Sequence, residues 1–267
     1  RIGLNRICRV AGLGNGRDGS FDYYISEPIV SNDLKGVGPF ILAGVEVDRV
    51  LHGAALPSAA RVARLGWEMV PEILARIIPP RFPERDFPIE DFGAVAGGEE
   101  DATAAIRAAI EACHAAGGGR VIVPPGVFRS GAIHLLSNVN LHLSEGAVLR
   151  FDSDPRKYLP LVYTRWEGVE LMNYSSLIYA FEQENIAVTG KGTLDGQANW
   201  DTWWSWNDKR QQPVKQRAPR DRLIEMAAKG VPVEERVFGE GSFLRPNFIQ
   251  PYRCRNILIE GVKIINS

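Results

Sequence analysis

Four tryptophans within one short stretch form the most distinctive group of side chains in the sequence: Trp200, Trp203, Trp204 and Trp206. Indole faces stack on the apolar C–H faces of sugar rings, so a tryptophan-rich loop is a candidate sugar-binding surface. The same rings could instead anchor the loop to the rest of the protein by being buried. The sequence leaves both interpretations open and singles out no one tryptophan.

Aspartates are the next candidates, because paired carboxyl groups can act as acid and base. Asp195 lies between a short strand and a glycine, where aspartate commonly forms turns, and we interpret it as a turn residue rather than a catalytic one. Asp152 and Asp154 precede a proline and are interpreted in the same way. Arg245 could flank a cleft, but we expect it to form a structural ion pair.

The spacing of the histidines, cysteines and glycines does not indicate a metal-binding or a nucleotide-binding site. The histidines are not spaced as metal ligands, and the cysteines fit neither a disulfide scaffold nor a zinc site. Gly14–Gly19 matches GxGxxG, but a helix is not predicted after it, so we interpret it as a turn. We therefore predict no metal and no cofactor. The residues concerned are His52, His114, His134, His142, Cys8, Cys113 and Cys254.

The overall composition is that of a globular protein without a charge bias. Its 267 residues are 45% hydrophobic and 24% charged, which is enough to build a sizeable core. The 31 basic and 32 acidic residues give a net charge of −1, which argues against nucleic acid as a partner. No apolar stretch is long enough to span a bilayer, so we expect no membrane partner.

The elements that position these side chains fall into three zones. Residues 1–57 form a β- and turn-rich segment of unassigned purpose, and residues 58–84 contain a helix, interrupted at Pro71, and a proline-rich linker. Residues 85–267 begin with an amphipathic helix at 101–116, which ends at a run of glycines. Short strands follow, with a tryptophan-rich insert at about 197–245.

Three segments share one pattern, in which Asn138, Asn185 or Asn256 precedes an alternating apolar pair. The intervals of 47 and 71 residues suit rungs of about 20–25 residues, the second interval including the insert. Hairpin turns of the Asn-Gly type do not join these strands. The pattern predicts an all-β parallel β-helix, with the helix at 101–116 capping its N-terminal end.

Several segments carry a resemblance to a known family. Phe87–Val95, the helix at 101–116 and Gly117–Gly126 resemble the opening of pectin-active β-helix enzymes. The segments that are similar to bacterial polygalacturonase-type glycoside hydrolases, family twenty-eight, are Glu170–Ser175, Gly192–Gly196 and Leu244–Val262. The resemblance covers residues from about 85 to 267 and does not extend to residues 1–57.

The resemblance implies a right-handed parallel β-helix that hydrolyses α-1,4-galacturonosyl bonds, in pectin or oligogalacturonides, by an inverting two-carboxylate mechanism. The family's catalytic motifs are Asn-Thr-Asp, Asp-Asp, Gly-His-Gly and Arg-Ile-Lys, and none occurs in residues 1–267. We therefore expect a β-helix truncated at its C-terminal end, with no catalytic residue in this chain and no activity of this chain alone. Its substrate-binding residues are not identified by the sequence.

Two other functions stay open. A β-helix polysaccharide lyase shares the Asp-Phe-Gly-Ala opening, although the segment Leu244–Gln250 favours a hydrolase. A non-catalytic stalk or adhesin, like a phage tailspike, would form trimers, whereas we expect the hydrolase to be a monomer. A cell-wall polymer as substrate favours the periplasm or the cell exterior, and short oligomers would suit the cytoplasm. Endo or exo action is not decided by these residues.

Overall fold

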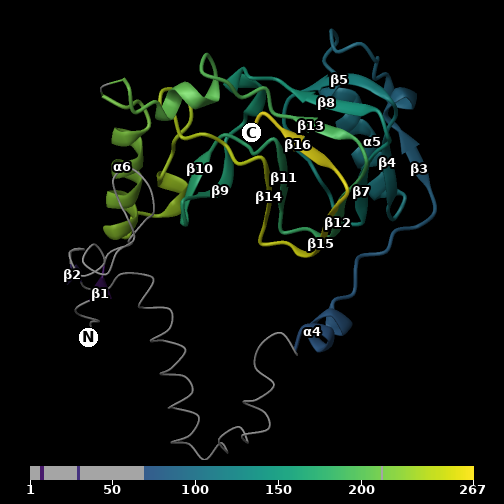
Figure 1. Ribbon diagram of the computed structural model, residues 1–267, viewed down its shortest axis with the longest axis horizontal. Coiled ribbons are helices and arrows are strands. Elements are labelled where there is room, and N and C mark those ends of the chain that lie inside the picture. Colours follow the sequence, from purple (N-terminus) through teal and green to yellow (C-terminus); the bar gives the residue numbers. More distant parts are fainter. Residues whose placement is uncertain (1–6, 9–28, 31–68, 212) are drawn as a thin grey trace, which may run out of the picture. The chain divides into compact units, whose positions relative to one another are not determined.

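The computed structural model describes residues 7–8, 29–30, 69–211 and 213–267 (Figure 1). The chain divides into two compact units, Arg1–Ile77 and Ile78–Ser267. In the first unit, β1 (Ile7–Cys8) pairs antiparallel with β2 (Ile29–Val30). Helix α4 (Val70–Arg76) contains Pro71 in its first turn, where the missing N–H breaks no helical hydrogen bond. The predicted helix start at 58–68, the Gly14–Gly19 motif and His52 lie outside the described residues.

The second unit is a parallel β-helix, in which successive turns of the chain stack their strands into three sheets (Figure 1). The first sheet contains β3 (Asp86–Pro88), β4 (Gly119–Val123), β7 (Val139–Leu143), β12 (Glu184–Gly190) and β15 (Arg255–Glu260). The second contains β5 (Gly126–Ser130), β8 (Ala147–Phe151), β13 (Thr193–Asp195) and β16 (Lys263–Ile265). The third contains β6 (Ile133–His134), β11 (Ile178–Phe181) and β14 (Ile249–Tyr252).

The remaining elements of this unit lie outside the stacked strands. They are the helices α5 (Thr103–Ala115) and α6 (Arg217–Ala228), the antiparallel strands β9 (Val162–Trp166) and β10 (Val169–Asn173), and the 3₁₀ turns η2 (Ile89–Phe92), η3 (Pro155–Tyr158), η4 (Trp203–Asn207) and η5 (Val233–Glu235). No helix in the described ranges is long and apolar enough to cross a membrane.

The repeat predicted from the sequence is confirmed as a stack, but the number of turns within the 47-residue interval needs a correction. Strands β4 and β7 pair Val121 with Leu141, which is one turn of 20 residues. Strand β12 pairs directly with β7, aligning Val188 with Leu141, so the 47-residue interval is a single turn. It is longer because β9 and β10 are inserted between β8 and β11. An inserted hairpin therefore has the same effect on spacing as an extra rung.

The interior of the tube is a ladder of aligned apolar side chains. Val121, Leu141 and Val188 occupy equivalent positions in neighbouring strands, and they are 0%, 0% and 1% exposed. At the outer corner, the Asn185 amide donates to Asn138 Oδ1 at 3.1 Å, and the Asn256 amide donates to Asn185 Oδ1. These three asparagines have φ values of 67°, 52° and 56°, a left-handed conformation that asparagine tolerates.

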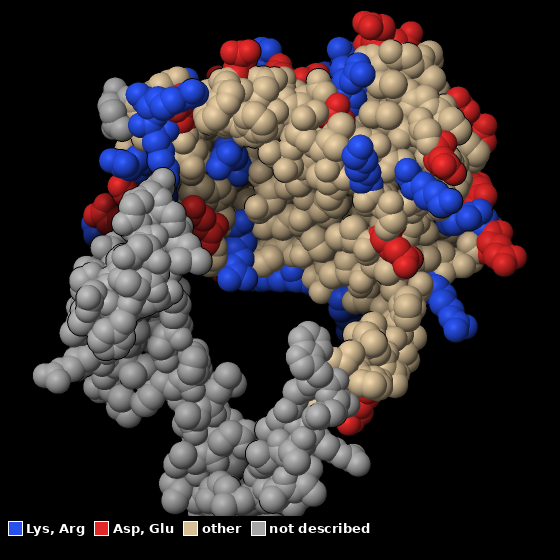
Figure 2. Space-filling view, in the orientation of Figure 1, with Lys and Arg blue, Asp and Glu red and all other residues tan. Residues whose placement is uncertain are grey.

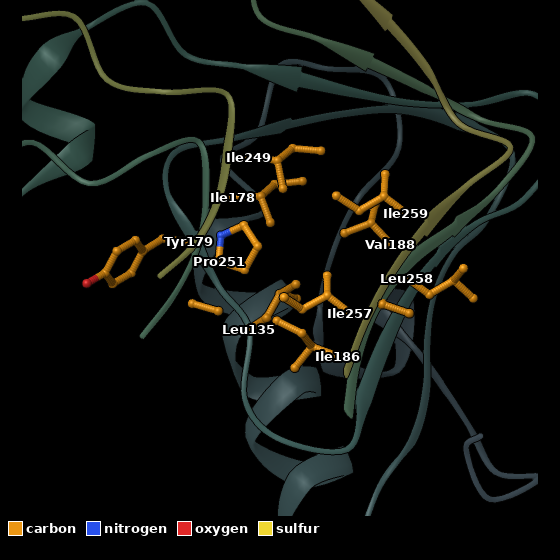
Figure 3. A pocket seen from close by; sticks show the side chains of 12 residues that line it. Leu135, Ile178, Tyr179, Ile186, Val188, Ile249, Pro251, Ile257, Leu258 and Ile259 are labelled. Carbon is orange, nitrogen blue, oxygen red and sulfur yellow. The ribbon is translucent and has the colours of Figure 1, made fainter. Parts of the chain in front are cut away.

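The two ends of the tube differ in what covers them. Helix α5 packs on η2, β3 and β4 and buries residues such as Ile106 and Ile110; its role as an end cap stays a prediction. At the opposite end, β14, β15 and β16 each lie at the edge of a sheet. Here Ile257 and Ile259 line an apolar pocket with Ile186 and Val188 (Figure 3), and they are 39% and 46% exposed.

Candidate functional site

A cavity of about 350 Å³ lies where the insert meets the tube. We call it the tryptophan cavity. Its walls come from the β9–β10 turn, from η4, from the segment before β14 and from the residues that follow β13 and β16. The polar and aromatic side chains among its lining residues are Trp166, Glu167, Trp203, Trp204, Asn207, Gln216, Arg245, Asn247, Phe248, Asn266 and Ser267.

A hairpin that the sequence analysis did not predict builds one wall of this cavity. Strands β9 and β10 are joined by Glu167 and Gly168 alone, and both residues have positive φ, 43° and 89°. Two left-handed residues are the requirement of a type I′ turn, which matches the twist of antiparallel strands. The absence of an Asn-Gly pair therefore did not exclude a hairpin, because Glu167 and Gly168 form the turn here. It places Trp166 and Glu167 at the cavity wall.

The tryptophans of the insert have different roles. Trp203 is 6% exposed and packs edge-on against Tyr158, with ring centroids 5.6 Å apart, so it anchors the insert to the tube. It also lines the cavity, and its buried indole N–H has no hydrogen-bond partner among the described residues. Trp204 lines the cavity and donates its N–H to the Ser267 carbonyl at 3.0 Å. The anchoring interpretation is confirmed for Trp203, and sugar binding by the cluster stays a prediction.

Arg245 is the cation of the tryptophan cavity, and it does not form the ion pair expected for it. Its guanidinium makes no ion pair or hydrogen bond within the part of the chain that the structure describes. The nearby carboxylate of Glu167 is paired with Arg220 instead, at 2.8 Å. Burial lowers the pKa of the half-buried Arg245, while the charge of Glu167 opposes that shift. A bound anion would compensate the charge that Arg245 carries into this cavity.

Side-chain amides complete the lining. Gln216 is 4% exposed, and its Oε1 has no donor among the described residues. Asn266 donates to Asp195 Oδ1 at 2.8 Å, and the same carboxylate accepts the Gln197 backbone N–H at 3.1 Å. Asp195 therefore closes a turn beside the cavity, as interpreted from the sequence. Asp152 and Asp154 also accept backbone N–H groups two residues on, at 2.9 and 3.0 Å.

His114, His134, His142, Cys113 and Cys254 are not among the residues that line the tryptophan cavity. His134 in β6 contacts Ser175 Oγ at 3.0 Å, and His142 in β7 contacts Thr189 Oγ1 in the neighbouring strand β12 at 2.9 Å. Cys113 and Cys254 are free thiols. Within the described ranges, no three metal-ligating side chains come together in a group.

The geometry therefore defines a class of protein. The chain is a parallel β-helix protein whose cavity combines indole rings, side-chain amides and one cation, Arg245, that has no ion pair among the described residues. Indoles bind the faces of sugar rings, amides bind hydroxyl groups, and an arginine in a dry site recognises a carboxylate. An acidic sugar satisfies all three requirements.

Comparisons with known proteins agree with this class. The solved structure of a hyperthermoactive exopolygalacturonase from Thermotoga maritima is 49% identical, with a TM-score of 0.72, over 75% of this chain and 46% of that one. The exo-poly-α-D-galacturonosidase of Dickeya chrysanthemi is 36% identical over 116 residues, 40% of this chain and 19% of that protein. Mannuronan C5-epimerase AlgE3 of Azotobacter vinelandii is 34% identical over 124 residues, 42% of this chain and 7% of that protein.

These findings confirm the resemblance: the chain is a relative of the polygalacturonase-type proteins, and it shares their parallel β-helix. The matched region spans less than half the length of each of these relatives. No protein-family model matches the chain.

Proposed function

We propose that the protein acts on galacturonan, the acidic polymer of pectin, and that the tryptophan cavity holds one galacturonate unit of it. The observation that carries this proposal is the half-buried Arg245, which has no ion pair among the described residues and lines the same cavity as the indoles of Trp166, Trp203 and Trp204. The printed names of two relatives, an exopolygalacturonase and an exo-poly-α-D-galacturonosidase, support galacturonan as the polymer.

Each group in the cavity has a part in holding such a sugar. The planar guanidinium of Arg245 can donate two parallel hydrogen bonds to a uronate carboxylate, a geometry that a lysine could not supply. Indole faces cover the apolar side of the pyranose ring and exclude water from it. The amides of Asn207 and Gln216 can exchange hydrogen bonds with ring hydroxyls. A neutral galactose unit would leave the buried charge of Arg245 uncompensated.

The proposal does not assign the hydrolytic step to residues 1–267. Inverting hydrolysis needs a carboxylic acid and a carboxylate about 6.5–9.5 Å apart, with a water molecule between base and sugar. The family motifs that supply these carboxylates do not occur in residues 1–267. We therefore assign scaffold and substrate binding to these residues, and expect them to release no reducing sugar from polygalacturonate. Release at an ordinary enzymatic rate would contradict this assignment.

Binding is tested by titrating intrinsic tryptophan fluorescence with short sugars of equal length. We expect digalacturonate to change the fluorescence saturably and the neutral galactose disaccharide to do so at least about tenfold more weakly. Equal affinity for both sugars, or none for digalacturonate, would overturn the proposal.

A second candidate polymer comes from the similarity to mannuronan C5-epimerase AlgE3. Mannuronan carries the same carboxylate on a ring with different hydroxyl stereochemistry. Dimannuronate is therefore included in the titration. Tighter binding of dimannuronate than of digalacturonate would move the assignment to that polymer.

A further inference from the structure

A second cavity, of about 520 Å³, adjoins the tryptophan cavity. The two cavities share Glu167, Asn207 and Gln216 as lining residues. The second cavity is otherwise lined by Lys209, Val214, Arg217, Arg220 and Asp221, and we call it the basic cavity. These shared residues form the boundary between the two neighbouring cavities.

The charge around the basic cavity differs from that of the rest of the chain. Its lining carries the three cations Lys209, Arg217 and Arg220 and the two carboxylates Glu167 and Asp221, a net charge of +1. Residues 208–222, which include most of this lining, contain six Lys or Arg and two Asp, whereas the whole chain has a net charge of −1. Figure 2 shows basic side chains gathered over the side of the second unit that contains α6. A local excess of positive charge at a cavity attracts a polyanion and raises its local concentration.

Not all of this charge is neutralised within the insert. Arg220 pairs with Glu167 at 2.8 Å and with Asp221 at 3.5 Å, and Arg210 pairs with Asp208 at 2.9 Å. The exposed side chain of Arg217, by contrast, has no ion pair or hydrogen bond among the described residues. Arg217 is therefore available to an anion in the basic cavity.

Gln216 gives independent evidence for a ligand at the wall between the cavities. Its backbone N–H donates to the Trp206 carbonyl at 2.9 Å, which fixes its position. Its side chain is 96% buried, since 4% of it is exposed, yet Oε1 accepts no hydrogen bond from the described residues. A buried acceptor without a donor costs stability, and a ligand hydroxyl reached by a small side-chain rotation would relieve that cost.

We infer that the basic cavity is a second binding site for the same acidic polysaccharide, which Arg217 recognises through a carboxylate. A chain with one unit in the tryptophan cavity passes Gln216 and places its next units in the basic cavity. This inference rests on the proposed function, because it takes the ligand of the tryptophan cavity to be a galacturonan. It predicts that affinity depends on the length of the ligand.

The test compares monogalacturonate with hexagalacturonate in calorimetric titrations of the full chain and of single variants. For Arg217→Gln we expect a loss of about threefold in affinity for the hexamer and no change for the monomer. Arg245→Gln weakens both ligands. Arg107→Gln, an equal loss of charge on α5, changes neither. Unchanged thermal midpoints show that the variants are folded.

The outcomes separate this inference from the proposed function. If Arg245→Gln weakens both ligands but Arg217→Gln weakens neither, or weakens both equally, the second site is refuted while the first stands. If neither ligand binds the unsubstituted chain, the proposed function fails. Hexameric poly-glutamate is the last control. If poly-glutamate bound as tightly as hexagalacturonate, the site would recognise negative charge alone, and the assignment to a polysaccharide would be overturned.

Discussion

The stacked strands and the insert at 197–245 are built on different principles. In the strands, the same position is filled by Val121, Leu141 and Val188 in successive turns, and each is buried by its neighbours above and below. In the insert no position repeats. Part of the insert packs on the main core through Trp203, and a second small cluster joins the β9–β10 hairpin to α6. The members of this second cluster are Trp166, Leu171, Leu223, Phe238 and Leu244.

The difference shows where stability and chemistry reside. A repeated ladder can lose or gain an excursion between strands without a change in its register, as the 47-residue turn shows. Such excursions carry Trp166, Gln216 and Arg245, the side chains that line the tryptophan cavity. Substitutions in the ladder should therefore affect folding, and substitutions in the cavity should affect binding. Four predictions test this separation, in order of decreasing effect.

The largest effect is expected from Leu141→Ala. Leu141 is 0% exposed and lies between Val121 and Val188, so its truncation leaves a cavity that the stacked backbone cannot close. We expect the free energy of unfolding in urea to fall by about 3–5 kcal/mol. Affinity of the folded variant for digalacturonate should stay within about twofold. Leu159→Ala, at a position 46% exposed, is the control; an equal loss there would contradict the ladder account.

Arg245→Gln should weaken ligand binding and leave the stability of the fold nearly unchanged. Removal of the cation that lines the tryptophan cavity should weaken digalacturonate binding by about 1.5–3 kcal/mol, or roughly tenfold to a hundredfold. Because Arg245 makes no ion pair in the described structure, the free energy of unfolding should change little. Affinity by calorimetry and stability in urea are measured on the same preparation. A lower free energy of unfolding with an unchanged affinity for digalacturonate would show that Arg245 has a purely structural role.

Asn185→Ala tests the corner of the tube. The substitution removes hydrogen bonds to Asn138 and Asn256 and places alanine at a φ of 52°. We expect a loss of about 1–2 kcal/mol in the free energy of unfolding. Asn185→Gly accepts the left-handed conformation and so isolates the hydrogen-bond contribution. If alanine and glycine cost the same, backbone strain is not part of the explanation.

The smallest effect concerns pH. Burial lowers the pKa of His134 in the folded state below its ordinary value of about 6.5, so the unfolded chain binds this proton more readily. Stability from the neutral imidazole is complete above about pH 6.5 and is lost as the pH falls from there through the folded-state pKa. His134→Gln should flatten this decline by less than about 1.4 kcal/mol per pH unit.

Urea unfolding at pH 5–8 measures this slope, and His142→Gln is the matched variant. Burial also lowers the pKa of His142, so its removal should act in the same direction. A steeper decline in either variant would have the wrong sign for a buried neutral imidazole.

The sequence predicted the repeating parts of this molecule better than its site. The asparagine corners and the alternating apolar pairs follow local rules, and the structure confirms both. Trp166, Gln216 and Arg245 line one cavity although more than seventy positions separate the first from the last, so no local sequence pattern indicates that they lie together. The turn at Glu167 was missed because its left-handed conformation is imposed by the strands on either side rather than by its residue type.

The most direct test of the central claim is a crystal structure of the protein with digalacturonate. We predict one sugar unit in the tryptophan cavity, with its carboxylate oxygens within about 3.2 Å of the Arg245 guanidinium and its ring against the indole of Trp204 or Trp166. A sugar bound elsewhere, or bound in the cavity with its carboxylate turned away from Arg245, would contradict the account.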